Sequence, residues 1–233
     1  MLRSVGCRWL VLLAVGSLAG CSRSSGGASP SGKPDAQAPS KAAHVQRVAP
    51  GDAPADLAKS RITLSVIKDK DQTSPVLGKL SLSDGAVALS ASPPSARLSI
   101  DVDSLDTGIP IRNERVRNLF FETSGVGWDT AELAIPSLGP DLVATLKAKR
   151  HVEQATLAGS LKVHGKTAKV TLVVDATYAE DGRLSVKTSA PAEVHISDFG
   201  LNDNLRRLSS VCMHDSIDDL VKVEVSLEFA PPK

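Results

Sequence analysis

Apolar and polar side chains alternate along most of the chain beyond residue 60, and this period of two indicates β-strands. The segment 168–178 has apolar side chains at every second position, namely Val170, Leu172, Val174 and Ala176. The segment 220–229 repeats the pattern at Val221, Val223, Val225, Leu227 and Phe229. Because successive side chains of a strand point to opposite faces, each segment has one apolar and one polar face.

Similar alternation predicts further strands, separated by turn signals such as Ser83-Asp84-Gly85, Gly165 and Asp181-Gly182. These strands span 62–67, 77–82, 96–102, 142–149, 155–164, 183–188 and 192–197. Strands that are apolar on one face only are typical of antiparallel sheets, so we expect an all-β fold. The apolar faces must be buried either between two sheets or inside a closed barrel, and the pattern alone does not choose between them.

Two short segments show helical spacing instead. In 112–121 one face holds Val116, Leu119 and Phe120, and in 201–208 one face holds Leu201, Leu205 and Leu208. We therefore expect two short helices among the strands. The first either caps the mouth of a barrel or forms a long surface connection.

The N-terminus has the features of an export signal. Arg3 and Arg8 give a positive start, and the apolar stretch 9–19 is too short to span a bilayer as a helix. The ending Leu18-Ala19-Gly20-Cys21 resembles a lipobox, in which the cysteine is acylated and becomes the first residue after cleavage. We expect Cys21 to anchor the protein in a membrane, because two or more acyl chains make attachment effectively permanent. The alternative is an ordinary signal peptide that leaves Cys21 as a free thiol.

Three regions follow from this reading. Residues 1–20 form a lipoprotein signal peptide, 21–58 hold the lipidated cysteine and a linker, and 59–233 form the β-domain. The linker is rich in Ser, Gly, Pro, Ala and Lys, and such a composition buries too little apolar surface to fold. We expect the protein in the cell envelope, facing the periplasm. Ser22 in place of Asp after the anchor favours the outer membrane in a cell with two membranes.

Charge and cysteine content exclude several functions. The chain has 27 basic and 26 acidic side chains, and the signal peptide removes the basic Arg3 and Arg8, so nothing attracts nucleic acid. Cys7 leaves with the signal and Cys21 is acylated, so Cys212 is the last thiol and no internal disulfide forms. Cys212 is either a small buried apolar residue or a redox group. We expect no catalytic residue, metal site or cofactor, since no familiar constellation is present.

Three blocks of residues, in matching order and spacing, carry a family resemblance. The first is 100–108 followed by Arg112-Asn113, Arg117 and Phe120-Phe121-Glu122; the second is 159–172; the third is Ser197-Asp198-Phe199-Gly200. Together they resemble the YceI-like family, although Arg115 replaces a usual histidine and 206–215 resemble an insertion. The resemblance implies an eight-stranded, lipocalin-like antiparallel barrel. Its lumen would hold a polyisoprenoid or an isoprenoid quinone.

The resemblance assigns the ligand-facing positions. The lining residues would be Leu98, Ile100, Val102, Phe120, Phe121, Leu161, Val163, Val170, Leu172, Val174, Val194, Ile196, Val223, Val225 and Leu227. Head-group contacts would come from Arg112, Arg115 and Arg117. An eight-stranded barrel has an interior that side chains either fill or leave open for one small ligand.

Three functions remain open. The first is a lipid-binding lipoprotein that stores or transports an isoprenoid-type molecule. The second is an envelope scaffold with a filled barrel that binds another envelope protein. The third is an enzyme linked to redox chemistry through Cys212.

Overall fold

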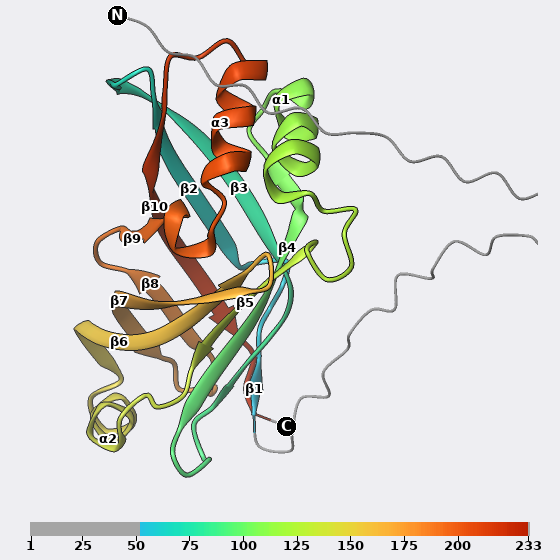
Figure 1. Cartoon of the computed structure of the whole chain (residues 1–233). Coiled ribbons are helices and arrows are strands. Elements are labelled where there is room, and N and C mark those ends of the chain that lie inside the picture. Colours follow the sequence, from blue (N-terminus) through green and yellow to red (C-terminus); the bar gives the residue numbers. More distant parts are fainter. Residues whose placement is uncertain (1–51, 233) are drawn as a thin grey trace, which may run out of the picture. The chain divides into compact units, whose positions relative to one another are not determined.

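The computed structural model describes residues 52–232, and eight of its strands form a closed ring (Figure 1). Around the ring the order is β3, β2, β10, β8, β7, β6, β5 and β4, and the β3–β4 pairing closes it. All pairings between neighbouring strands are antiparallel. The choice left open between a sandwich and a barrel is therefore decided in favour of the barrel.

The ring strands differ in length. Their bounds are β2 (Arg61–Lys68), β3 (Asp71–Ala88), β4 (Ser95–Asp106), β5 (Thr130–Ile135), β6 (His151–Val163), β7 (Lys166–Tyr178), β8 (Leu184–Thr188) and β10 (Ile217–Phe229). Two short strands lie beside the ring: β1 (Ala53–Pro54) pairs with β3, and β9 (Ala192–His195) pairs with β10.

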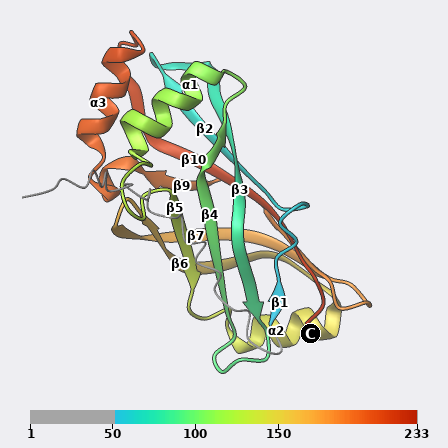
Figure 2. The same cartoon turned by 90° about the vertical axis from the view of Figure 1, so that its right-hand side faces the viewer.

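Helices lie at both ends of the barrel (Figures 1 and 2). At one end, hereafter the helical end, α1 (Pro110–Arg115) continues into the π-helix η1 (Val116–Phe121), and α3 (Asn202–Val211) lies against η1. The opposite end carries α2 (Pro140–Lys149). A short 3-10 helix, η2 (Ile196–Phe199), follows β9 in the chain. None of the helices described in residues 52–232 is long and apolar enough to cross a membrane.

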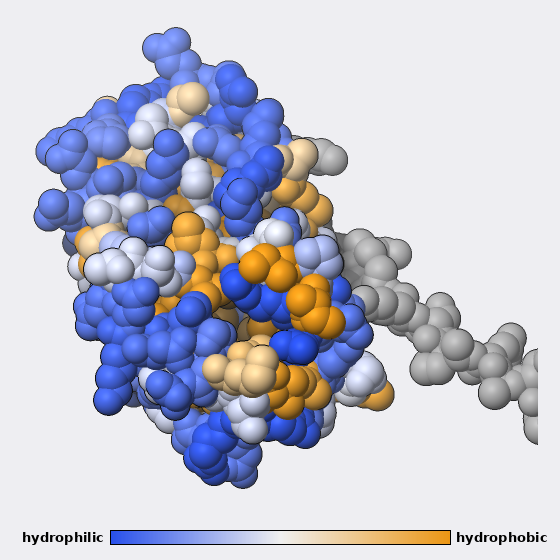
Figure 3. All heavy atoms as spheres, turned by 90° about the horizontal axis from the view of Figure 1, so that it is seen from above, coloured by the Kyte–Doolittle hydropathy of each residue, from blue (hydrophilic) through white to orange (hydrophobic). Residues whose placement is uncertain are grey.

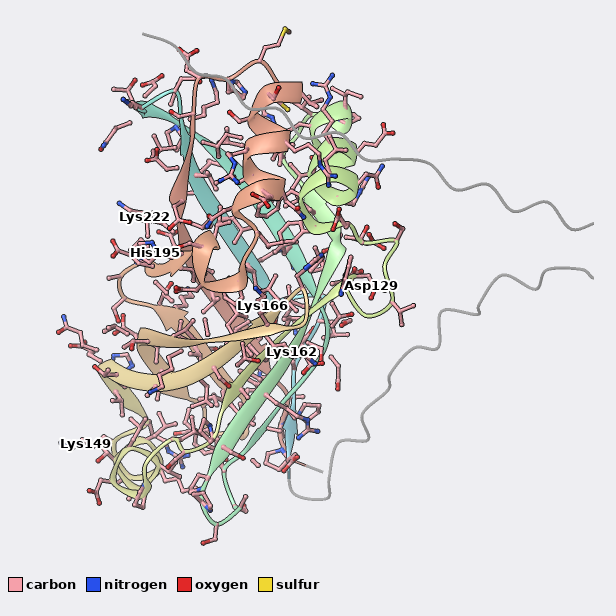
Figure 4. The ribbon with its side chains drawn as sticks, viewed as in Figure 1. Asp129, Lys149, Lys162, Lys166, His195 and Lys222 are labelled. Carbon is pink, nitrogen blue, oxygen red and sulfur yellow. The ribbon has the colours of Figure 1, made fainter. Side chains whose placement is uncertain are left out.

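Alternation along the strands separates the interior of the barrel from solvent. On β10, Val225, Leu227 and Phe229 are buried. Polar side chains such as Lys162, Lys222 and His195 lie on the outside of the barrel and are exposed (Figure 4). The apolar faces predicted from the period of two are thus the inner faces of the barrel.

The predicted strand 142–149 is wrong, because this segment is α2. Gly139, which has a φ of 76°, precedes the helix. Pro140 occupies the first turn, where the N–H that proline lacks would have no partner within the helix. Asp141 lies in the first turn and two lysines in the last, which complements the helix dipole. Val143 and Leu146 are buried at a spacing of three, so the helix covers the barrel end with one apolar face.

Three smaller predictions also need correction. The predicted turn at Ser83-Asp84-Gly85 lies inside β3, where the register with β4 shifts between Leu82 and Asp84. The strand predicted for 192–197 ends at His195 and gives way to η2. The fold begins before position 59, because Ala53 and Pro54 of the predicted linker pair with β3.

Candidate ligand-binding site

An apolar cavity of about 250 Å³ lies inside the helical end of the barrel. Side chains from β2, β3, β4, β5, β6, β7, β9 and β10 line it, and α1, η1 and α3 contribute from above. We call it the main cavity. The filled interior that a scaffold would need is therefore not found in this part of the barrel.

Pairing between β2 and β10 shows how the sequence builds the wall. The register places Val221 opposite Val66, Val223 opposite Leu64, and Val225 opposite Ile62. All six of these side chains line the main cavity. Because their spacing of two matches the pleat, one face of each strand supplies an aliphatic surface. Among the described residues, phenylalanine rings reach the cavity only from helical elements, at Phe120, Phe121 and Phe199.

The roof of the cavity is η1 covered by α3. Phe120 and Phe121 meet edge to face, with ring centroids 4.7 Å apart. The last carbonyls of a helix lack partners within it. Here Asn204 Nδ2 donates to the Phe120 carbonyl at 2.8 Å, and Arg207 Nη2 donates to the Leu119 carbonyl at 2.7 Å. These bonds hold α3 on η1.

A second contact reinforces this roof. Arg207 Nη2 donates to Glu122 Oε1 at 2.8 Å, and Glu122 ends η1 with a left-handed φ of 52°. The hydrogen bond from Arg207 lowers the pKa of the Glu122 carboxyl below its ordinary value and outweighs the opposing effect of burial. Glu122 is therefore held as a carboxylate at neutral pH.

The turn between β4 and α1 is fixed by side chains of the first family block. Asn113 Oδ1 accepts hydrogen bonds from the Thr107 backbone N–H at 2.8 Å and from Thr107 Oγ1 at 2.6 Å. Asn113 Nδ2 donates to Asp106 Oδ1 at 3.1 Å. Hydrogen bonds from the Gly108 backbone N–H and from Asn113 lower the pKa of Asp106. The network sets the direction in which α1 leaves the barrel rim.

Most of the predicted lining residues meet at the main cavity. Those that line it are Leu98, Ile100, Val102, Phe120, Phe121, Leu161, Val163, Val170, Leu172, Val194, Ile196, Val223 and Val225. The other two, Val174 and Leu227, line a separate cavity of about 80 Å³ toward α2, hereafter the lower cavity. They lie farther along β7 and β10 than the residues around the main cavity.

The three predicted head-group arginines differ in their contacts. Arg112 lines the main cavity, and within residues 52–232 its guanidinium has no hydrogen-bond or ion-pair partner. Arg115 Nη1 instead lies 3.8 Å from Cys212 Sγ, and Arg117 Nη1 donates to the Asp103 carbonyl at 3.0 Å. Of the three, Arg112 lines the main cavity and Arg115 and Arg117 do not, and head-group contact by any of them stays a prediction.

Other polar lining residues were missed from the sequence. Lys68, Thr107, Cys212 and His214 lie at the helical end of the main cavity, and His214 Nδ1 is 2.8 Å from Asp69 Oδ2. No local pattern marks these positions, because the fold brings them together from distant loops and element ends. Within residues 52–232, no group of three or more His, Cys, Asp or Glu side chains is placed to hold a metal ion.

Apolar lining from three ring strands was also missed. Alternation predicted β2 and β3 but did not assign their inner faces, and β5 was not recognised. These strands contribute Ile62, Leu64, Val66, Val76, Leu80, Ala131 and Leu133.

The barrel with its apolar lumen defines a ligand-binding class of fold, and comparisons name the family. The family model described as YceI-like domain matches residues 55–229. The chain belongs to the YceI-like domain family, as the sequence blocks indicated. No curated protein matches the chain.

Two solved structures share the fold. A polyisoprenoid binding domain from Saccharophagus degradans, implicated in plant cell wall breakdown, is similar at a TM-score of 0.62 and 21% identity, covering 79% of this chain and 100% of that one. BcnA from Burkholderia cenocepacia is similar at a TM-score of 0.52 and 21% identity, covering 75% of this chain and 98% of that one. The expected eight-stranded, lipocalin-like barrel is confirmed.

Proposed function

We propose that this protein is a lipid-binding lipoprotein that holds the tail of an isoprenoid-type lipid, such as a polyisoprenoid or an isoprenoid quinone, in the main cavity. The observation that carries the proposal is the cavity of about 250 Å³ with an aliphatic wall. Side chains that line an unfilled apolar space lack packing partners on one side. An apolar occupant that supplies these contacts would stabilise the barrel.

The distribution of polarity supports a ligand with a long tail and a small head. The polar lining residues, including Arg112, Lys68 and His214, all come from the helical end, whereas the strands below contribute aliphatic side chains. A tail would lie among the strands and a head group near Arg112. Family membership and the polyisoprenoid binding named for the Saccharophagus domain favour an isoprenoid tail.

Transfer from a bilayer fits the physical chemistry of such a site. Moving a tail from lipid to barrel exchanges one apolar environment for another, so the net affinity depends on packing and head-group contacts. Acylation of Cys21, which lies outside the described residues, would keep the barrel at high effective concentration beside its ligand. The protein would then store or carry the lipid at the periplasmic side of an envelope membrane.

The helical end presents apolar side chains that suit an approach to a membrane. Ile109 and Ile111 at the start of α1 are 42% and 53% exposed, and Val211 and Met213 at the end of α3 are 44% and 90% exposed. Figure 3 looks onto this end and shows apolar surface among hydrophilic residues. An exposed apolar rim around a lipid cavity favours contact with bilayer lipid.

Mass spectrometry of co-purified lipid tests the proposal. We expect wild-type protein, purified from membranes and extracted with organic solvent, to release close to one isoprenoid-type lipid per chain. Ala131 lines the main cavity on β5, so Ala131→Phe should fill the cavity and reduce the bound lipid several-fold. Ala134 lies on the same strand but is exposed, so Ala134→Phe is the matched control and should retain the lipid.

Two results would oppose the proposal. If wild-type protein yields no lipid and takes up no added isoprenoid quinone, the cavity does not bind an isoprenoid-type lipid. Equal lipid content in both phenylalanine variants would place the ligand elsewhere.

A further inference from the structure

The main and lower cavities share four lining residues. Leu98, Leu133, Leu172 and Val225 are the only residues of the described chain that line both. We call this set the floor layer. On its other side, the lower cavity is closed by α2, whose buried Val143 and Leu146 line it.

The floor layer spans the lumen from several sides. Its members come from β4, β5, β7 and β10, which are distributed around the ring, and Leu98 is paired directly with Leu133. Their relative exposures are 5% for Leu98 and 8% for each of the other three, so all four are buried. Four converging aliphatic side chains therefore separate two apolar spaces inside one barrel.

The register shift in β3 gives Leu98 its position. A Cβ added to Gly85 would lie 2.8 Å from Leu98 Cδ2, so Leu98 occupies space that any larger residue at position 85 would need. Gly85 follows the shift between Leu82 and Asp84 and is paired with Leu98. The absence of a side chain at Gly85 thus makes room for the floor layer.

We propose that the floor layer is where the ligand tail ends, so that these four side chains set the longest tail the barrel accepts. This inference rests on the proposed lipid-binding function. A tail that reached the layer would meet four buried aliphatic side chains, which lie between it and the lower cavity. The lower cavity, at about 80 Å³ against 250 Å³, would add about a third to the available space if the layer were opened.

Tail-length selectivity tests the proposal. Full-length protein, stripped of lipid and kept in a non-ionic detergent, is titrated with geraniol, farnesol, geranylgeraniol and solanesol. For wild type we expect affinity to rise with length and then stop rising. In Leu133→Ala the rise should continue to a longer alcohol, whose affinity relative to the shorter ones increases several-fold, because the longer tail gains packing contacts beyond the floor layer.

Two matched leucine substitutions control for cavity size alone. Leu80 lines only the main cavity and Leu157 only the lower cavity. Leu80→Ala and Leu157→Ala each enlarge one space without joining the two, so both should keep the wild-type length limit. Leu98→Val, a smaller truncation in the floor layer, serves if Leu133→Ala fails to fold, and should move the limit in the same direction.

The outcomes separate this inference from the proposed function. If wild type binds none of the alcohols, the lipid-binding function itself fails. The floor layer does not limit the tail length if wild type binds the alcohols but the limit is unchanged in both floor-layer variants. The same conclusion follows if Leu80→Ala and Leu157→Ala shift the limit as much as the floor-layer variants do.

Discussion

Arg207 Nη2 on α3 donates a 2.8 Å hydrogen bond to the carboxylate of Glu122, which ends η1. The same guanidinium also bonds the Leu119 carbonyl, so one side chain joins the two helices that cover the main cavity. Glu122 Oε2 in turn lies 3.3 Å from His164 Nε2 on the β6–β7 connection. Arg207 therefore holds α3 on η1, and Glu122 lies beside the barrel wall at His164.

Arg207→Ala should loosen this roof. Because Arg207 is about half exposed, solvent screens the ion pair and we expect a loss of stability of about 1 kcal/mol. Release of bound lipid should become several-fold faster, as measured by transfer to acceptor vesicles. The control is Arg206→Ala on the same helix, where the arginine pairs with exposed Asp203. Equal release rates for the two variants would show that the Arg207 contacts do not restrain the ligand.

Glu122 should contribute to the pH dependence of the free energy of unfolding in acid. Its pKa is lowered in the folded state below the ordinary 4.5, chiefly by the hydrogen bond from Arg207. The unfolded chain therefore binds this proton more readily, so the stabilisation is fully present above pH 4.5 and is lost as pH falls through the folded pKa. Unfolding midpoints of wild type and Glu122→Gln should differ at neutral pH and converge in acid. A constant difference at all pH values would contradict this assignment.

Variants of Arg112 and Arg117 should affect different properties, the first lipid retention and the second stability. Arg112 lines the main cavity, so Arg112→Gln should weaken retention of the lipid several-fold with little change in unfolding temperature. Arg117 donates to the Asp103 carbonyl, so Arg117→Gln should cost about 1 kcal/mol of stability and leave lipid retention unchanged. Denaturant unfolding and quantitative lipid extraction measure the two effects. Equal loss of lipid in both variants would remove Arg112 from the head-group site.

Exposed apolar residues at the helical end should speed transfer to and from a bilayer. We expect a double variant, Ile111→Ser with Met213→Ser, to slow lipid exchange with vesicles several-fold while the amount of lipid bound at equilibrium stays the same. Val126 is fully exposed on the loop between η1 and β5, at 100% relative exposure, and Val126→Ser is the control. An exchange rate unaffected by the double variant would argue against this end as the membrane-facing one.

Anchoring and binding should be independent. Cys21→Ser removes the acylation site, so we expect the protein to leave the membrane fraction. Any protein that is exported should still bind isoprenoid quinone added to it, because the described residues that line the cavity all lie beyond position 60. Membrane fractionation and labelling with radioactive palmitate measure the first effect. Persistent membrane attachment and labelling of the variant would exclude Cys21 as the lipidated residue.

Sequence reasoning succeeded where burial follows a simple period. The segments 168–178 and 220–229 alternate because one face of β7 and one face of β10 line the barrel interior, and this geometry dictates apolar residues at every second position. The helix predicted over 112–121 and the one over 201–208 are likewise confirmed, since a helix on a surface needs only one apolar stripe.

The failures have equally local causes. In α2, apolar residues at every second position resemble a strand, namely Leu142, Ala144, Leu146 and Ala148, and the helix-starting Pro140 outweighs this pattern. In β5 two of the six residues are alanines, Ala131 and Ala134, which give a weak alternating signal. The helical end of the main cavity depends on loops and strand ends that meet only in the folded chain, so no spacing in the sequence could reveal that Lys68 and His214 share a cavity.

The proposed function requires that a lipid tail lies inside the main cavity. A farnesol analogue with a photoreactive group at the tail end, crosslinked to the full-length protein and mapped by peptide mass spectrometry, tests it most directly. We predict adducts on inward-facing residues of the wall, such as Leu64 and Val223, and their loss in Ala131→Phe. Adducts confined to exposed residues, or unaffected by Ala131→Phe, would contradict it.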